Sequence, residues 1–324
     1  MQSVVETTRP DMTLREKLDG YLRLERSFFG IPEEEDKEPD IGILGVPYDL
    51  TSSHTPGSRF GPDAIRKATD NERSHGYPLL IGKGPIDSHK PLSEIITLED
   101  IGDLEVGVQL PESVEVHISE VAKILAASNS SLIFLGGDHF ITYPIMKGLK
   151  RASQGKWGLF YLDSHADFYK DYGGADLSHA STVRRIAEQD IVDLQDIVVY
   201  DMRCAPPDQR VELQPLISED LITIEDVAVR FRNVSSAVER VHLSIDLDIL
   251  DPIYAPGVSH PESGGVSVEQ LVTLIRLAFA TGKIYSVDIV EFNPLLDENG
   301  LTAIAARDVL KEVLWGFTIA KQKV

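Results

Sequence analysis

The apolar residues of this chain fall into two kinds of segment. Short runs rich in β-branched and aromatic residues are typical of strands; they are IGILGV from Ile41, SLIFLGG from Ser131, WGLFYLD from Trp157, DIVVYDM from Asp196, LITIED from Leu221, VHLSIDLD from Val241 and KIYSVDIVEF from Lys283. Longer segments with helical spacing lie between them, namely SVEVHISEVAKILAASN from Ser113, SVEQLVTLIRLAFATG from Ser267 and TAIAARDVLKEVLWGFTIAK from Thr302. Strands that alternate with helices predict a three-layer α/β/α fold around a mostly parallel sheet of about eight strands.

The N-terminal part of the chain departs from this pattern. Residues 30–40 read GIPEEEDKEPD, which is acidic and proline-bearing, and this composition favours a solvated linker. We therefore expect an N-terminal extension over residues 1–40 and a single domain over residues 41–324.

Composition excludes several classes of function. The 31 basic and 52 acidic residues give a net charge of −21, which disfavours binding to nucleic acid or to an anionic membrane. The single cysteine, Cys204, excludes an intrachain disulfide framework and fits a reducing compartment. No segment has the apolar length of a membrane span or the pattern of a signal peptide, so we expect a cytoplasmic protein.

Candidate chemistry follows three of the predicted strands. Six carboxylate and imidazole side chains stand there at short spacing: His139 in GGDHF, Asp163, His165 and Asp167 in DSHAD, and Asp246 and Asp248 in SIDLDILDP. Residues two apart on an extended backbone point to the same side, so the members of each segment can converge. Parallel sheets bind ligands beyond the carboxyl ends of their strands, where all three segments lie.

The joint pattern favours a binuclear metallohydrolase. Each residue alone has an ordinary explanation, such as a helix cap or a structural histidine. Four carboxylates gathered without cations would oppose each other's ionisation, however, and two divalent cations would balance their charge. Oxygen and imidazole ligands without thiolates suit two Mn²⁺ ions, with Co or Ni as substitutes.

The motifs resemble those of the ureohydrolase family, which contains arginase, agmatinase and their relatives. The similarity covers the chain from about Ile41 onward and is closest to the agmatinase-like branch. The motifs occur in family order as GVPYDLTSSHTPGSRFGPDAIRKA from Gly45, GGDHFITYP, DSHAD, SIDLDILDPIYAPG and VDIVEFNP. The resemblance implies an arginase-like fold and a hydrolase that cleaves a guanidino group to urea and an amine.

The resemblance also implies a role for each site residue. One Mn²⁺ would be held by His139, Asp163, Asp167 and Asp246, and the other by Asp163, His165, Asp246 and Asp248. Glu291 corresponds to the family carboxylate that binds the guanidinium, with a surface glutamate as its ordinary alternative. His179, in LSHAS, corresponds to the histidine that relays a proton to the leaving amine, with a plain loop histidine as its alternative.

The loop between Asp167 and His179 bears on the substrate. It reads FYKDYGGADLS, which has no such set of asparagine and serine residues as the one with which arginases bind the α-carboxylate and α-amine. This favours a small cationic substrate, agmatine first, with putrescine as product and a place in polyamine biosynthesis. Asp171 or Asp176 is a candidate for a distal ammonium, with a solvated loop aspartate as the favoured alternative for each, whereas Lys170 or Arg203 would suit a carboxylate and a guanidino acid.

Alternatives remain open at this point. Other substrates in the class are guanidinobutyrate, guanidinopropionate, arginine, guanidine and formimidoglutamate. A deacetylase of related fold would hold one zinc, and a catalytically silent structural or regulatory homologue would be expected to lack a site residue. Departures from the family pattern at Ser164, Phe140, Ala180 and the Ser259–Pro261 turn leave the six ligands intact. The resemblance further implies a homotrimer or homohexamer.

Overall fold

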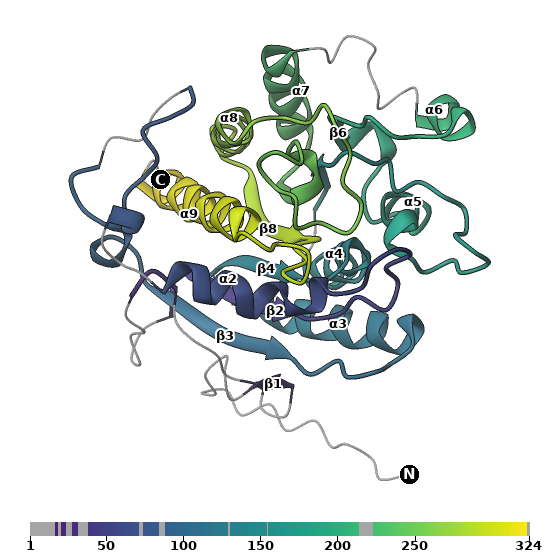
Figure 1. Ribbon diagram of the computed structural model, residues 1–324, viewed down its shortest axis with the longest axis horizontal. Helices are drawn as coiled ribbons and strands as arrows, with labels where there is room; N and C mark the ends of the chain where they lie inside the picture. Colours follow the sequence, from purple (N-terminus) through teal and green to yellow (C-terminus); the bar gives the residue numbers. More distant parts are fainter. Residues whose placement is uncertain are drawn as a thin grey trace.

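One mixed sheet organises the protein (Figure 1). The computed structural model describes residues 17–18, 21–23, 28–31, 38–70, 74–83, 88–128, 130–153, 155–213 and 223–322. Its eight strands lie in the order β1-β3-β2-β4-β8-β7-β5-β6, and β1–β3 is the antiparallel pair in an otherwise parallel sheet. The predicted sheet is confirmed. The strands are β1 (Leu22–Arg23), β2 (Ile41–Val46), β3 (Leu98–Leu104), β4 (Ser131–Gly136), β5 (Trp157–Leu162), β6 (Ile197–Tyr200), β7 (Arg240–Asp246) and β8 (Ile284–Val290).

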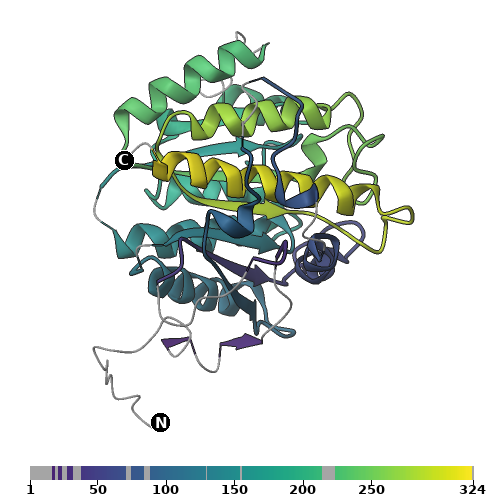
Figure 2. The ribbon, with the colours of Figure 1, turned by 90° about the vertical axis from the view of Figure 1, so that its left-hand side faces the viewer.

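Helices cover both faces of this sheet and complete the predicted three layers. One apolar core joins the sheet to α2 (Gly61–Thr69), α7 (Ile224–Ala237), α8 (Val268–Phe279) and α9 (Leu301–Gln322). Figure 2 shows α7, α8 and α9, coloured green to yellow, in front of the sheet. A second core on the other face includes α3 (Pro111–Leu125), α4 (Thr142–Ala152), α5 (Thr182–Glu188) and Leu213 of the short helix α6 (Pro207–Leu213).

The alternation of side chains along β5 shows how the two cores arise. Leu159 and Tyr161 belong to one core, whereas Phe160 and Leu162 belong to the other, and all four are fully buried. A strand with both faces buried reads as a continuous apolar run, because no position along it faces water.

Two elements differ from the sequence expectation. The predicted strand LITIED is wrong, because Thr223 caps α7, which begins at Ile224; Leu221 and Ile222 lie outside the described residues. The Thr223 hydroxyl and the Asp226 carboxylate form a capping box that favours the helix. In contrast, β3 was not predicted, because Asp100 and Asp103 interrupt its apolar pattern. Both aspartates are buried and bind the guanidinium of Arg66 at 2.6–2.9 Å.

The N-terminal extension expected over residues 1–40 lies largely outside the described residues. β1 belongs to it and pairs with β3 at the sheet edge. Among the helices that the structure describes, none is long and apolar enough to cross a membrane.

Candidate metal centre

Four adjacent strands at the middle of the sheet carry the predicted site. β4, β8, β7 and β5 are neighbours in that order, and their carboxyl ends lead directly to His139, Glu291, Asp246 and Asp163. Residues separated by more than a hundred positions are therefore brought to one edge by sheet topology. The six predicted ligands and Glu291 all lie at this edge.

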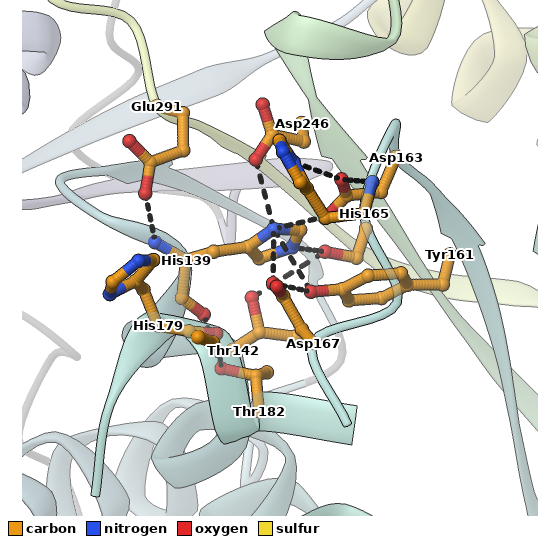
Figure 3. Close-up of polar contacts among 12 residues, drawn as sticks. His139, Thr142, Tyr161, Asp163, His165, Asp167, His179, Thr182, Asp246 and Glu291 are labelled. Carbon is orange, nitrogen blue, oxygen red and sulfur yellow. Dashed lines mark hydrogen bonds and ion pairs between the residues drawn. The ribbon is translucent and has the colours of Figure 1, made fainter. Parts of the chain in front are cut away.

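His139 is the centre of the first group (Figure 3). Its Nδ1 lies 2.9 Å from Asp163 Oδ2, 3.0 Å from Asp246 Oδ2 and 3.5 Å from Asp167 Oδ2. Its Nε2 lies 2.8 Å from the hydroxyl of Ser244, which donates a hydrogen bond to buried Asp288. Because that hydroxyl accepts the Nε2 proton, Nδ1 is left as the atom directed at the carboxylates.

Asp163 also belongs to a second group with His165 and Asp248. His165 Nδ1 lies 2.8 Å from Asp248 Oδ2 and 3.5 Å from Asp163 Oδ1. The ligand atoms of this group lie within 4.8 Å of one another, as do those of His139, Asp163 and Asp167. Asp246 joins the groups, since its Oδ2 faces His139 and its Oδ1 accepts a hydrogen bond from Asp248 N at 2.7 Å.

The backbone that gathers these residues is not the extended chain expected from the sequence. β5 ends at Leu162, and Asp167 has a φ of +45°, a left-handed conformation that is unusual for a residue other than glycine. β7 ends at Asp246, and Asp248 lies in a 3₁₀ turn (Leu247–Ile249) capped by the Asp246 side chain. Turns after the strands, rather than strand alternation, therefore aim these ligands.

The charges at this edge fit divalent cations. Burial and neighbouring carboxylates raise the pKa of Asp167 to about 7 and that of Asp246 well above its ordinary value. Burial opposes ionisation of Asp163 too, but the His139 and His165 rings keep its pKa low. Asp163 Oδ2 is buried and faces His139 Nδ1 at 2.9 Å. Buried carboxylates around an imidazole nitrogen are typical ligands of a divalent metal.

Glu291 faces the same space from the end of β8. Its φ is +64°, and its backbone N–H donates to Gly137 O at 2.9 Å. One carboxylate oxygen accepts a hydrogen bond from His139 N at 2.8 Å, whereas Oε2 is buried without a partner in the described part of the chain. Burial and the nearby Asp246 and Asp138 raise its pKa well above the ordinary value.

His179 is held in one tautomer by the loop that follows β2. Its Nδ1 lies 2.6 Å from the carbonyl of Thr51, which only accepts hydrogen bonds, so Nδ1 carries the proton. Nε2 is left as an acceptor, 3.3 Å from Ser53 Oγ. Thr51 in turn is held by buried Asp138, whose carboxylate accepts hydrogen bonds from the Thr51 N–H and hydroxyl. Burial, and to a lesser degree His260, lowers the pKa of His179 to about 4, so the ring is neutral at neutral pH.

A cavity of about 200 Å³ opens onto these groups. We call the side chains at its base the floor: His139, His165, Asp167, Asp246, Asp248 and Glu291, with Asp163 buried beneath them. We call the side chains around it the wall: Ser53, Tyr169, Tyr172, His179, Cys204, Pro206, Gln209 and His260. The structure does not bring Asp176 to this cavity, since Asp176 is exposed and absent from both sets.

Several of these residues were not found from the sequence. Tyr161 lies inside an apolar strand, and Gln209 and Ser53 belong to loops or a short helix without a recognisable motif. His260 had a visible signal, because it stands in the Ser259–Pro261 departure from the family pattern. Its ring stacks on His179 with centroids 5.1 Å apart, and Ser53 Oγ lies 3.0 Å from its Nε2.

A three-layer α/β fold with a carboxylate- and histidine-lined cavity at the carboxyl edge of its sheet is typical of α/β enzymes that bind metals there. The arginase family profile matches residues 39–316. A guanidinobutyrase from Pseudomonas aeruginosa is 31% identical over 293 residues, which cover 85% of each chain. An agmatinase from Halalkalibacterium halodurans is 30% identical over 280 residues, covering 85% of this chain and 91% of the relative.

The chain belongs to the arginase family and is a ureohydrolase-family hydrolase acting on linear amidines. The fold agrees with solved structures. A hypothetical agmatinase from Burkholderia thailandensis superposes with a TM-score of 0.75 at 25% identity, covering 91% of each chain. Proclavaminate amidino hydrolase from Streptomyces clavuligerus has the same fold, with a TM-score of 0.78 at 24% identity, covering 92% of this chain and 99% of that one. The family implies a binuclear metal site, with which the two buried groups agree.

Proposed function

We propose that this protein hydrolyses a guanidino compound that has no carboxylate, agmatine first, to urea and a primary amine. The observation that carries this choice is the composition of the cavity. Its described lining contains acidic, aromatic and amide side chains but neither lysine nor arginine. A cationic or neutral substrate suits such a lining better than an anionic one.

The proposal includes two divalent cations, with Mn²⁺ first and Co or Ni as substitutes. The residues that would hold them are His139, Asp163, Asp167 and Asp246 for one and Asp163, His165, Asp246 and Asp248 for the other. Such a pair would lower the pKa of a bound water molecule and so supply hydroxide near neutral pH.

Glu291 is proposed to bind the guanidinium. Its Oε2 is buried and unpaired in the described part of the chain, while its Oε1 is held by the His139 backbone. A guanidinium N–H directed at Oε2 would make a charge-assisted hydrogen bond, which favours the ionised carboxylate despite burial. The fixed carboxylate would thus orient the planar guanidino group over the floor.

His179 is proposed to relay a proton to the leaving amine. Its Nδ1–H donates a hydrogen bond to the Thr51 carbonyl, so Nε2 is the atom that can take up and return a proton. A neutral imidazole whose Nε2 carries no proton is the form that this role requires.

The wall supports a substrate without a carboxylate. Arg203 was a candidate for binding such a group, but its guanidinium bonds the Asp201 carboxylate and the carbonyls of Asp248, Ile249 and Glu262. Lys170 is exposed and does not line the cavity. Guanidinobutyrate is the second candidate, because one relative is a guanidinobutyrase.

Urea release from a panel of substrates tests the proposal. The purified protein, loaded with Mn²⁺, Co²⁺ or Ni²⁺, would be assayed with agmatine, guanidinobutyrate, guanidinopropionate, arginine, guanidine and formimidoglutamate. We expect the largest kcat/KM for agmatine and none after chelation. Preference for guanidinobutyrate would overturn the choice of substrate. Binding without turnover of any of them would favour the silent homologue.

We also propose the organisation expected from the sequence. Residues 41–324 would form one domain with residues 1–40 as an extension, and the chain would form a cytoplasmic homotrimer or homohexamer. Light scattering during size-exclusion chromatography measures the oligomer, and a monomer would contradict it.

A further inference from the structure

Tyr161 is a buried side chain beneath the floor with no role in the reaction described above. It lies on β5, two residues before Asp163 in the chain, and is fully buried. Its ring stacks on the imidazole of His139, with centroids 4.4 Å apart and planes 10° from parallel. β7 and β8 separate β5 from β4 in the sheet, so this contact links the two outer strands of the site.

The hydroxyl of Tyr161 contacts two proposed metal ligands. It donates a hydrogen bond to Asp167 Oδ2 at 2.7 Å and lies 3.0 Å from His139 Nδ1 (Figure 3). These are its hydrogen-bond partners among the described residues. A phenylalanine would fill nearly the same volume and stack on the same ring, so packing alone does not account for the hydroxyl.

Asp167 is the residue that most needs such support. Its left-handed backbone, with φ of +45°, is a strained conformation that persists only where neighbouring contacts hold it. Val183 N, at the start of α5, donates to its carbonyl at 3.1 Å. Tyr161 holds its carboxylate, so the backbone and the side chain of Asp167 are fixed from opposite ends.

We propose that Tyr161 is a positioning residue that sets the affinity of the cation held by His139, Asp163, Asp167 and Asp246. The inference rests on the proposed binuclear site. Groups that hydrogen-bond to metal ligands fix their orientation, and their loss costs about 10–100-fold in metal affinity. No hydrogen bond or ring contact joins Tyr161 to His165 or Asp248 among the described residues, so we expect the other cation to be much less affected.

The test compares Tyr161→Phe with Tyr285→Phe. The second variant is a matched control, because Tyr285 lies near the start of β8, away from the carboxyl edge, where its hydroxyl is 3.5 Å from Ala126 O. Each full-length protein would be titrated with Mn²⁺ against a graded chelator, and bound metal would be counted by mass spectrometry. We expect Tyr161→Phe to weaken one of two sites by about 10–100-fold, with Tyr285→Phe indistinguishable from wild type.

A double-mutant cycle shows whether Tyr161 acts through Asp167. In the Asp167→Asn background, Tyr161→Phe should weaken the same site much less than it does in the wild-type background. An equal effect in both backgrounds, or unchanged affinities in Tyr161→Phe, would overturn the inference while leaving the proposed function intact. A wild-type protein without two metal sites would overturn both. Thermal unfolding of the metal-free variants checks that the fold is retained; if Tyr161→Phe does not fold, Tyr161→Leu, which is smaller and also lacks the hydroxyl, replaces it in the same titration.

Discussion

The floor and the wall of the cavity differ in how firmly their side chains are held. On the floor, Asp163, Asp246 and Asp248 are almost fully buried, and each contacts other ligands or backbone N–H groups. On the wall, Tyr172 is 39% exposed, and the Gln209 amide is buried but unpaired in the described part of the chain.

This difference separates the requirements of chemistry from those of recognition. Metal chemistry needs ligands held to within a fraction of an ångström, which dense buried networks provide. Recognition of a variable substrate tail needs side chains that gain partners only when the ligand arrives. We infer that the floor, together with His179, carries the reaction common to the family and that the rest of the wall distinguishes one substrate from another.

Removing a floor ligand should have the largest effect. Asp248→Ala is expected to lose one cation and at least about 10³-fold in kcat/KM, because metal activation of water contributes several kcal/mol. Metal content and urea release measure the two effects. Asp251→Ala is the control, since this nearby loop aspartate bonds only backbone N–H groups and should retain both cations. Full activity in Asp248→Ala would refute the two-cation assignment.

Neutralising Glu291 tests the floor without disturbing a proposed ligand. Glu291→Gln is expected to lower kcat/KM by about 10²–10³-fold, because a buried charge-assisted contact is worth about 3–4 kcal/mol when the transition state needs it. Metal content should stay at the wild-type level. Glu298→Gln, a change at an exposed loop position, should cost little by comparison. Equal losses in the two variants would show that Glu291 has no special role.

The protonation of His179 predicts how acid affects stability. Its folded pKa of about 4 lies below the unfolded value of 6.5, so the unfolded chain binds a proton first as the pH falls. The stability that the protein gains from keeping this ring neutral is fully present above about pH 6.5. It is lost as the pH falls to 4, which lowers the free energy of unfolding by about 3 kcal/mol.

Denaturation of the metal-free protein at pH 7.5 and pH 4.5 measures this cost. The decrease in the free energy of unfolding between pH 7.5 and pH 4.5 should be smaller in His179→Gln than in the wild type. His89→Gln, which alters an exposed histidine, should behave as the wild type does. The same loss in all three proteins would contradict the role assigned to burial.

Changing a wall residue other than His179 should have the smallest effect on chemistry. Gln209→Leu is expected to change KM for agmatine by up to about tenfold, or about 1.4 kcal/mol, because one hydrogen-bonding group to the tail is removed. KM for guanidine, which has no tail, should be the same in Gln209→Leu as in the wild type. Steady-state kinetics of both proteins with agmatine and with guanidine test this prediction. A similar change for both would place Gln209 with the floor rather than with the wall.

Much of the fold could be predicted because apolar periodicity follows from burial. β4, β5, β7 and β8 are buried on both sides and read as continuous apolar runs, which is how they were found. β3 was missed because Asp100 and Asp103 pair with Arg66, whose partners are invisible until the chain folds. The wrong strand at Leu221 shows the converse error, since Thr223 and Asp226 favoured a capped helix over a short β-branched run.

The sequence by itself determined the family, the layered fold and the set of side chains at the floor, because ligand types, spacing and apolar runs are local properties. Only the tertiary structure decided how these side chains are aimed. Contacts between segments far apart in the chain decide the turns at Asp167 and Asp248 and the stacking of Tyr161 on His139. They also decide that the proton of the His179 ring lies on Nδ1 and not on Nε2. The wall likewise depends on loops that carry no periodic pattern, so its residues became visible only once the strands had brought them together.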